Sequence, residues 1–226
     1  PNPFGPEKIT LRSYFDLFNF KANHRKTLVV DTDQGWKALV TSMNPHDGSS
    51  RHSNIGLLVW GTTAVDILRT EQSVGIMSQA NMPAIIAGDF QAENTQPQVQ
   101  VLTEKAIYDA TLNLIQTAKE NEQIDLAMFY LSERKIIKSL IAAHERKVKV
   151  RVLLDPNKDA FGREKNGIPN RQVAWELYKA GIDVRWCRTQ GEQCHSKMII
   201  KRNTQQAEMI LGSANFTARN LKNYNL

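Results

Sequence analysis

The chain of 226 residues carries a formal net charge of +6 and has an isoelectric point near 9.3. Its hydrophobic content of 41% and charged content of 23% are typical of globular proteins and exclude an intrinsically disordered chain. No apolar run reaches the roughly 18 residues of a membrane span, and the longest runs, such as residues 55–60, have the length of a strand. The basic charge favours an anionic partner, and a mildly basic soluble protein is the plainer interpretation.

The first part of the chain predicts a small antiparallel sheet and one helix. Residues 26–30 have the composition of a strand, and residues 37–40 are placed to form its hairpin partner. The polar segment 44–54 contains Pro, Gly and Ser residues and predicts a loop. Residues 55–60 predict a further strand, and residues 64–77 carry apolar side chains at helical spacing.

A polar segment at residues 88–98 separates this part from the remainder. Its Gln, Asn, Asp and Pro residues are typical of a linker. We therefore expect two domains. Residues 1–98 would hold the first domain and the linker, and residues 99–226 would hold the second.

Strands and helices alternate after this segment. Thr103 is placed to cap one helix and Ser132 to cap another, because apolar residues follow each of them at helical spacing. Strands are predicted at residues 124–131, 148–154, 182–187, 196–201 and 209–211, and a further helix at residues 171–180 that ends at Gly181. This alternation predicts an α/β fold with a mainly parallel sheet covered on both faces, and a ligand site at the carboxyl ends of the strands.

Two matching motifs stand 171 positions apart. The first begins at His24, continues through Lys26 and Asp31, and is followed by a Ser-x-Asn segment with Ser42 and Asn44. The second repeats this order in His195, Lys197, Gly212, Ser213 and Asn215. Because alternate side chains of a strand share one face, each histidine is expected to point the same way as its lysine.

This combination of side chains suits a phosphate group. Lysine neutralises the anion, histidine reaches the phosphorus or the leaving oxygen, and the Ser and Asn side chains offer neutral donors. The backbone N–H groups near Gly212 are further candidate donors. Two histidines permit a two-step displacement, in which one forms a phosphohistidine while the other protonates the leaving alcohol and later deprotonates the acceptor. This chemistry requires no metal and no other cofactor.

The two motifs resemble the paired HxKxxxxD motifs of the phospholipase D superfamily, and the sequence around His24 is similar to its bacterial cardiolipin-synthase-type members. The resemblance implies a phospholipase D-like fold of two βα repeats with mixed or mainly parallel sheets flanked by helices. Residues 1–98 would then be the C-terminal part of the first repeat with a linker, and residues 99–226 the second repeat. It also implies one shared site, with His24 as nucleophile and His195 as general acid. Its catalytic set would be His24, Lys26, Asp31, His195 and Lys197, and its phosphate-binding set Ser42, Asn44, Gly212, Ser213 and Asn215.

The chain departs from the family pattern in three places. Arg202 stands where the second motif has Asp, a residue that supports the motif through hydrogen bonds. One residue instead of two separates Ser42 from Asn44. The first repeat also lacks its N-terminal strands and helices, so we expect the chain to be part of a longer protein.

The expected activity is that of a metal-independent phosphodiesterase or phosphatidyltransferase acting on phospholipids. A phospholipid or other phosphodiester would be the substrate, an anionic membrane surface is a candidate partner, and a cytoplasmic or membrane-associated location is expected. A nuclease of the same superfamily is an alternative, since the basic charge also suits a nucleic-acid backbone. A weakened phosphate-binding protein is another, because of Arg202. The plainest alternative is two hairpins whose histidines make only local hydrogen bonds.

The remaining cysteine and histidine residues have structural interpretations. Cys187 and Cys194 are expected to pack as small apolar thiols, with a disulfide across a turn as the alternative. His46 and His52 lie in the polar loop beside the first motif, where we expect them to be solvated rather than to touch substrate. His144 is expected at the edge of the core.

Overall fold

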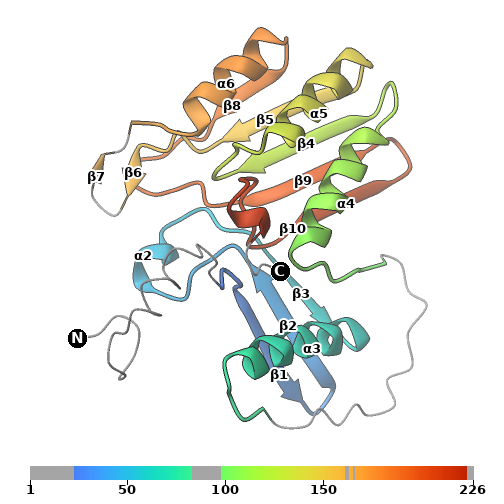
Figure 1. The fold of residues 1–226 in the computed structure, drawn as a ribbon, viewed down its shortest axis with the longest axis vertical. Coiled ribbons are helices and arrows are strands. Elements are labelled where there is room, and N and C mark those ends of the chain that lie inside the picture. The colour runs from blue at the N-terminus through green and yellow to red at the C-terminus, as the bar shows by residue number, and fades with distance from the viewer. Residues whose placement is uncertain (1–22, 83–97, 161–162, 165, 223–226) are drawn as a thin grey trace.

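The computed structural model describes residues 23–82, 98–160, 163–164 and 166–222 (Figure 1). Two sheets organise these residues, one from each part of the chain. The linker predicted at residues 88–98 lies outside the described residues apart from its last position, and the division into domains at residue 98 stays a prediction.

The first sheet is a three-stranded antiparallel meander in the order β1-β2-β3. Its strands are β1 (Thr27–Thr32), β2 (Gly35–Thr41) and β3 (Gly56–Trp60), which confirms the predicted hairpin and the strand after it. Helix α3 (Thr62–Met77) covers one face, where Ala38, Val59, Ala64 and Ile67 form a small core. The predicted loop at 44–54 contains one short helix, α2 (Asp47–Ser50).

The second sheet has five strands in the order β10-β9-β4-β5-β8. These are β4 (Gln123–Met128), β5 (Lys149–Leu154), β8 (Asp183–Trp186), β9 (Lys197–Arg202) and β10 (Ala207–Leu211). Strands β4, β5 and β8 are parallel, but β9 pairs with β4 in the antiparallel sense. Residues 187–196, all of which the structure describes, join β8 to β9 without a crossover helix, so the chain re-enters the sheet at the end where β8 finished. The sheet is therefore mixed, which agrees with the expected α/β fold of mixed or mainly parallel sheets flanked by helices. The mainly parallel sheet that the alternation alone predicted does not extend to β9 and β10.

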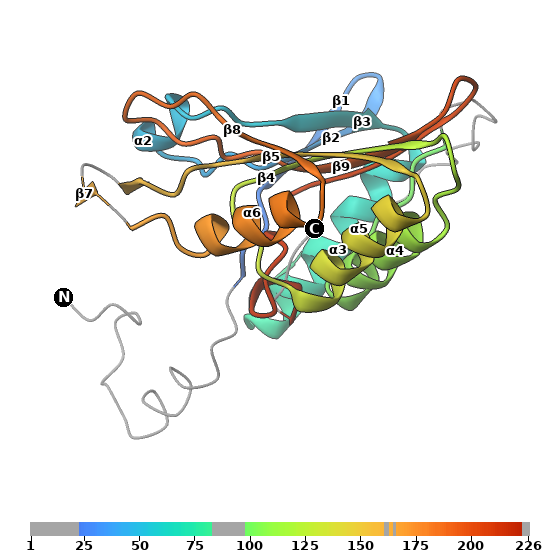
Figure 2. The same cartoon turned by 90° about the horizontal axis from the view of Figure 1, so that it is seen from above.

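The longer helices lie on one side of both sheets in the described residues (Figure 2). They are α3 and, over the second sheet, α4 (Lys105–Gln116), α5 (Arg134–Glu145) and α6 (Asn170–Lys179). Side chains of β4 and β5 alternate accordingly, with Ile124, Leu126, Val150 and Val152 buried beneath the helices. The sequence predicted helices on both faces, but within the described residues the opposite face carries polar and charged residues on β4 and β5.

The ends of the helices differ slightly from the predicted caps. Glu104 and Glu133 occupy the N-cap positions of α4 and α5, one residue after the predicted Thr103 and Ser132. Gly181 follows α6 with a φ of +86°, as predicted for the residue that ends a helix. A Cβ atom there would lie 3.0 Å from Nε2 of the half-buried His144, which confirms a position at the core edge for this histidine.

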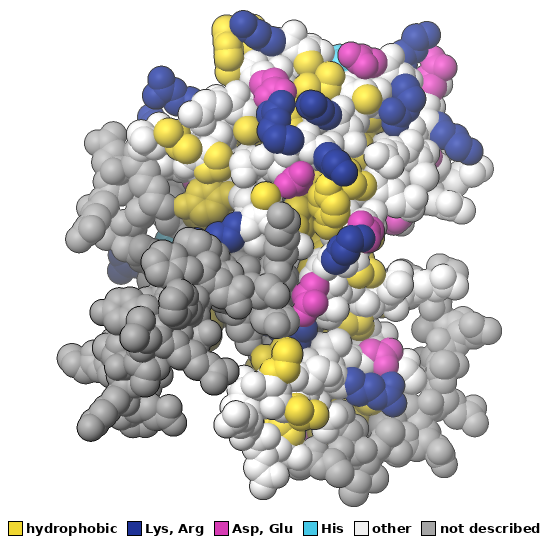
Figure 3. All heavy atoms as spheres, viewed as in Figure 1, with side chains coloured by type: hydrophobic (Ala, Val, Ile, Leu, Met, Phe, Trp, Pro, Cys, Tyr) yellow, Lys and Arg dark blue, Asp and Glu magenta, His cyan; other side chains and the backbone are white. Residues whose placement is uncertain are grey.

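The remaining elements are short. Two-residue strands β6 (Asp159–Ala160) and β7 (Arg163–Glu164) pair with each other, and a single 3₁₀ turn, η1 (Asn220–Lys222), lies near the end of the described chain. Lysine and arginine side chains are spread over the helices of the second sheet on the face seen in Figure 3. Among the described helices, none is both long and apolar enough to cross a bilayer.

Candidate active site

The two motifs each place a histidine and a lysine at the start of a strand. His195 lies on the segment that joins β8 to β9, and Lys197 is the first residue of β9. His24 and Lys26 precede β1 in the same way. His195 is 5% exposed, Lys197 2% and Lys26 8%, so the site combines buried cations with a buried imidazole.

The two lysines adopt the same local contact. Nζ of Lys26 donates to the backbone oxygen of His24 at 2.8 Å, and Nζ of Lys197 donates to that of His195 at 2.9 Å. Each ammonium group therefore folds back beside its own histidine. A lysine buried at this cost is typical of an anion site, because a bound anion offsets the desolvation of the charge.

A direct contact joins the two halves of the chain. Nδ1 of His195 and Oδ1 of Asn54 are 3.1 Å apart. The Asn54 amide nitrogen donates to the backbone oxygens of Ser49 and His52, which fixes the orientation of the amide and leaves Oδ1 as an acceptor. Nδ1 of His195 therefore carries the proton, and in the neutral ring Nε2 is the basic nitrogen.

Backbone contacts reinforce this junction. The amide of Ser53 donates to the carbonyl of Gln193 at 2.9 Å, and the Ser196 hydroxyl donates to the carbonyl of Ser53 at 3.2 Å. The amide of Gln193 donates to Nδ1 of His52 at 3.1 Å. The segment before β3 thus lies against the segment before β9, which brings the two motifs to one region of the molecule.

The electrostatics of His195 indicate that the first motif is close. Its pKa is lowered to about 2, first by burial and then by the charges of Lys197, Lys26, His52 and His24. The pKa of Lys197 falls well below its usual value through burial and the charge of Lys26, and Asp155 opposes this fall. His195 is consequently neutral in the unliganded protein, in a surrounding that carries excess positive charge.

Lys26 gives the site a testable dependence on pH. Burial lowers the pKa of Lys26 to about 8, so its charge is present below this pH and is lost above it. We expect the affinity for inorganic phosphate, measured by isothermal titration calorimetry, to decrease as the pH rises from 7 to 9. Lys26→Met should bind more weakly and remove the decrease centred near pH 8. If wild-type affinity is constant across this range, Lys26 does not contribute its charge to the site.

The predicted phosphate-binding residues differ in their hydrogen-bond partners and in their burial. The Ser42 hydroxyl donates to Oδ1 of Asn54 at 3.3 Å and accepts from the amide of Ile55 at 2.9 Å, so it supports Asn54. The Gly212 amide donates to the carbonyl of Lys197 at 3.3 Å and is not directed at a ligand. The buried Asn215 donates through Nδ2 to Asn220. Ser213 is buried and Asn44 is half-buried.

The Asp position of each motif lies away from the histidines. Asp31 is exposed and pairs in register with Trp36 near the hairpin end of β1. Five residues of strand place it about 16 Å from Lys26. Arg202 occupies the matching place at the far end of β9, where its Nε lies 3.4 Å from Asp125. The structure therefore brings His24, Lys26, His195 and Lys197 together but leaves Asp31 outside the group.

Sequence reasoning missed several residues that surround His195. The ring of Phe129 meets its imidazole edge-on at 4.7 Å, and Nζ of Lys197 lies 5.0 Å from the centre of the same phenyl ring. The His52 ring is 6.1 Å from that of His195, although a solvated position was predicted for it. Burial and, next, the charge of His46 lower the pKa of His52. The Asn54–His195 contact spans 141 positions, and no local pattern signals it.

The prediction of separate thiols was wrong. Cys187 and Cys194 form a disulfide, which ties the end of β8 to the residue before His195. A separation of only seven positions allows this, because the intervening residues form a turn at the sheet edge. The disulfide limits the movement of the segment that carries His195.

Comparison with known proteins identifies the family to which the chain belongs. A model of the cardiolipin synthase, phospholipase D-like domain matches residues 111–226, just over half of the chain. The chain belongs to the phospholipase D superfamily. A search of curated proteins gave no significant match.

Three solved structures illustrate the likeness. Polyphosphate kinase from Porphyromonas gingivalis aligns with 98% of this chain and 34% of its own, at 18% identity and a TM-score of 0.59, which shows a shared fold alone. Nuc from Salmonella typhimurium, a phospholipase D family member, is 25% identical over 55% of this chain and 77% of its own, with a TM-score of 0.44. NucT from Helicobacter pylori is 14% identical over 53% of this chain and 73% of its own chain, with a TM-score of 0.39.

The charges on the neighbouring strands give Arg202 a structural explanation. Asp125 on the neighbouring strand accepts from Nε of Arg151 at 2.6 Å and lies 3.4 Å from Arg202. An aspartate at position 202 would face this carboxylate and repel it, whereas an arginine is attracted. The change therefore belongs to an ion-pair group at the far end of the sheet and leaves the surroundings of His195 intact.

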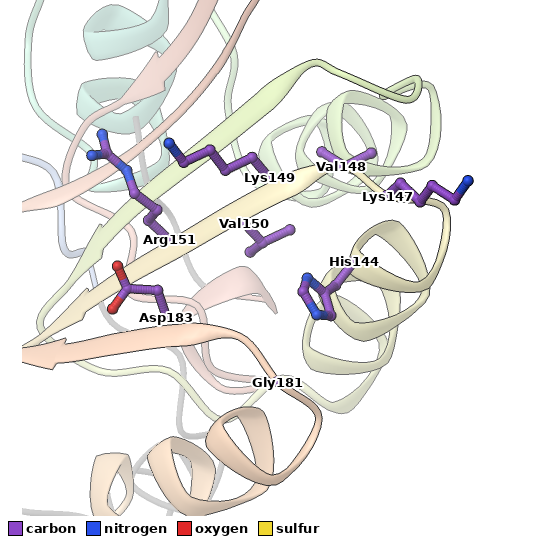
Figure 4. Close-up of a pocket in the computed structure, with 8 residues that line it drawn as sticks. All are labelled: His144, Lys147, Val148, Lys149, Val150, Arg151, Gly181 and Asp183. Carbon is purple, nitrogen blue, oxygen red and sulfur yellow. The ribbon is translucent and has the colours of Figure 1, made fainter.

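A cavity of about 500 Å³ at the opposite end of the second sheet is a second candidate for a ligand site. It is lined by His144, Lys147, Val148, Lys149, Val150, Arg151, Gly181 and Asp183 (Figure 4). It lies at the amino ends of β5 and β8, whereas His195 lies at their carboxyl ends. Among the described residues, no group of three or more His, Cys, Asp or Glu side chains is arranged to hold a metal ion.

Proposed function

We propose that this protein cleaves or transfers phosphodiesters through a phosphohistidine, and that its substrates are phospholipids. The observation that carries the proposal is the contact of His195 with Asn54 between the two halves, together with the two buried lysines. Phosphoryl transfer depends chiefly on positioning and charge neutralisation, and both lysines supply the latter.

The residues would act in two balanced steps. In the first, a ring nitrogen of His24 attacks phosphorus, the bond from phosphorus to the leaving alcohol breaks, and His195 gives that oxygen a proton. In the second, His195 takes a proton from water or an acceptor alcohol, whose oxygen attacks phosphorus and breaks the bond to His24. Burial and, next, the lysine charges lower the pKa of His195; the bound phosphodiester anion offsets the lysine charges and thus raises this pKa, which favours the protonated imidazole that the first step needs.

An exposed aromatic surface on α6 favours a lipid substrate over a nucleic acid. Trp175 and Tyr178 are 58% and 64% exposed, and their rings are 6.0 Å apart at 20°. Nζ of Lys179 lies 4.9 Å from the Trp175 ring centre, which sets a positive charge beside the exposed rings. Aromatic rings beside lysine are typical of surfaces that enter the interfacial region of a bilayer.

This surface predicts weaker membrane association when its aromatic side chains are removed. We expect the double variant Trp175→Ala/Tyr178→Ala to bind phosphatidylglycerol vesicles roughly tenfold more weakly in sedimentation assays. Two aromatic rings that enter the bilayer interface contribute on the order of 1–2 kcal/mol to such binding. Hydrolysis of a water-soluble phosphodiester should stay unchanged. Equal vesicle binding by wild type and variant would remove this support for a lipid substrate.

Three substrates in parallel test the proposed function. Phosphatidylglycerol vesicles, bis(p-nitrophenyl) phosphate and single-stranded DNA should each be incubated with the protein in EDTA. Release or exchange of the lipid headgroup supports the proposal. Cleavage of DNA without lipid turnover would identify the nuclease alternative, and no turnover of any substrate would favour a phosphate-binding protein.

A further inference from the structure

Asp155 is a buried acid next to the site that neither motif contains. It directly follows β5, and its amide donates to the carbonyl of Met128 at 3.3 Å. The residue is 2% exposed. Met128 pairs in register with Leu154 on one side and with Lys197 on the other. Asp155 is thus held at the carboxyl ends of the central strands, beside the entry to β9.

Both carboxylate oxygens hold nearby chain segments. Oδ2 accepts from the amide of Cys194 at 2.7 Å, one residue before His195. Oδ1 accepts from the backbone amide of Asn157 at 2.6 Å and from its side-chain amide at 3.0 Å. A carboxylate that accepts several N–H groups remains ionised. Asp155 therefore anchors the His195 segment as an anion.

The same network reaches the ring that contacts His195. The carbonyl of Phe129 accepts from Nδ2 of Asn157 at 2.9 Å and from Nδ2 of Asn170 at 2.8 Å. Asn170 also donates to the carbonyl of Asp155 at 2.9 Å. Asp155, Asn157 and Asn170 thus fix the backbone at Phe129, whose side chain lies against the His195 imidazole.

The charges around Lys197 give this carboxylate a second effect. Lys26 lowers the pKa of Lys197 and Asp155 raises it. The other titratable groups that face this region are His24, His195 and His52, and Glu192 acts on His52 from the exposed turn. Among the described residues, Asp155 is the only Asp or Glu that is buried, and its charge acts on the buried Lys197.

We propose that Asp155 is a positioning residue of the proposed site, which holds the His195 segment in place and sets a negative charge near the buried Lys197. This inference rests on the proposed phosphate site. It assigns the acidic support of the second motif to the end of β5 rather than to position 202, where Arg202 stands. Asp155 itself does not touch the substrate.

Asp155→Asn separates this role from general stabilisation. The substitution keeps the size of the side chain and removes its charge, so the pKa of Lys197 falls further. The loss of phosphate affinity relative to wild type should then grow as the pH rises from 6 to 8, because Asp155 raises the pKa of Lys197. The affinity should be at least about tenfold weaker at pH 8, because a shift of one pKa unit changes the protonated fraction by that factor. A solely structural role would weaken binding equally at both values.

The test is a titration of the full chain with inorganic phosphate from pH 6 to pH 9 by calorimetry. Asp155→Glu should regain most of the affinity at pH 8. Asp125→Asn is the matched control, because Asp125 also contacts cations on neighbouring strands but lies at the other end of the sheet. Equal losses at all pH values for Asp155→Asn, or none, would overturn the inference. Absence of phosphate binding in wild type would instead overturn the proposed function.

A measurement on the wild-type protein covers the case in which Asp155→Asn does not fold. In ¹³C NMR, the Asp155 carboxyl signal should show an inflection at the pH where Lys197 deprotonates. An Asp155 signal without an inflection shared with Lys197 would show that the two charges are not coupled.

Discussion

Replacing either His24 or His195 with alanine should lower the turnover of bis(p-nitrophenyl) phosphate by at least ~10³-fold, since the first variant lacks the nucleophile and the second lacks the base that activates the acceptor in the second step. The two losses should not add in the double variant, because the two residues act as a unit. Steady-state release of p-nitrophenol measures all three rates. His144→Gln is the control, because this histidine lies at the opposite end of the second sheet.

The covalent intermediate distinguishes the two histidines. Acid quenching of wild type during turnover should trap a phosphoryl adduct on a histidine, and mass spectrometry should locate it on His24. His195→Ala should still form this adduct with a p-nitrophenyl leaving group, which departs without a proton. An adduct on His195 would reverse the assigned roles, and near-wild-type rates in both single variants would rule out a composite site.

Replacing Asn54 with alanine should lower kcat by about 100-fold, or ~2.7 kcal/mol of transition-state stabilisation. The Asn54 oxygen accepts the Nδ1 proton of His195, so its removal frees the ring to rotate and to change tautomer. Substrate KM should change little, because the lysines remain. The same assay measures both constants.

Two further variants show whether Asn54 acts through the imidazole. Asn54→Asp keeps the acceptor and adds a negative charge, which raises the pKa of His195, so the acidic limb of the kcat profile should move to higher pH. Ser53→Ala is the matched control, because only the backbone of Ser53 joins the two halves. An Asn54→Ala enzyme with wild-type kcat would show that His195 needs no orienting partner.

The elements that sequence alone predicted are those set by local pattern. Strands β1 to β3 and helix α3 follow from alternating and helical spacing within short windows. The direction of β9 was missed because it depends on how the chain returns from β8, which involves no periodic signal. Pairing of Cys187 with Cys194 was missed for a similar reason, since pairing depends on the fold of a turn.

The candidate site was predicted only in part. The histidines and lysines stand in motifs, and their resemblance to a family indicated that the motifs meet. Asn54 and Asp155 act through contacts with residues 141 and 39 positions away, and each stands alone in the sequence. Asp31 and Arg202 belong to the motif pattern but lie at the far ends of their strands. A motif thus identifies reacting groups more readily than the residues that orient them.

The central claim is that the two motifs form one anion site, and a phosphate titration followed by ¹⁵N NMR of the imidazole nitrogens tests it most directly. Signals of His24 and His195, assigned with the alanine variants, should shift together and give one dissociation constant. The His195 signals should also move toward the protonated form, since the bound anion offsets the charges of Lys26 and Lys197 that lower its pKa. Shifts of one histidine alone, or two different dissociation constants, would contradict a shared site.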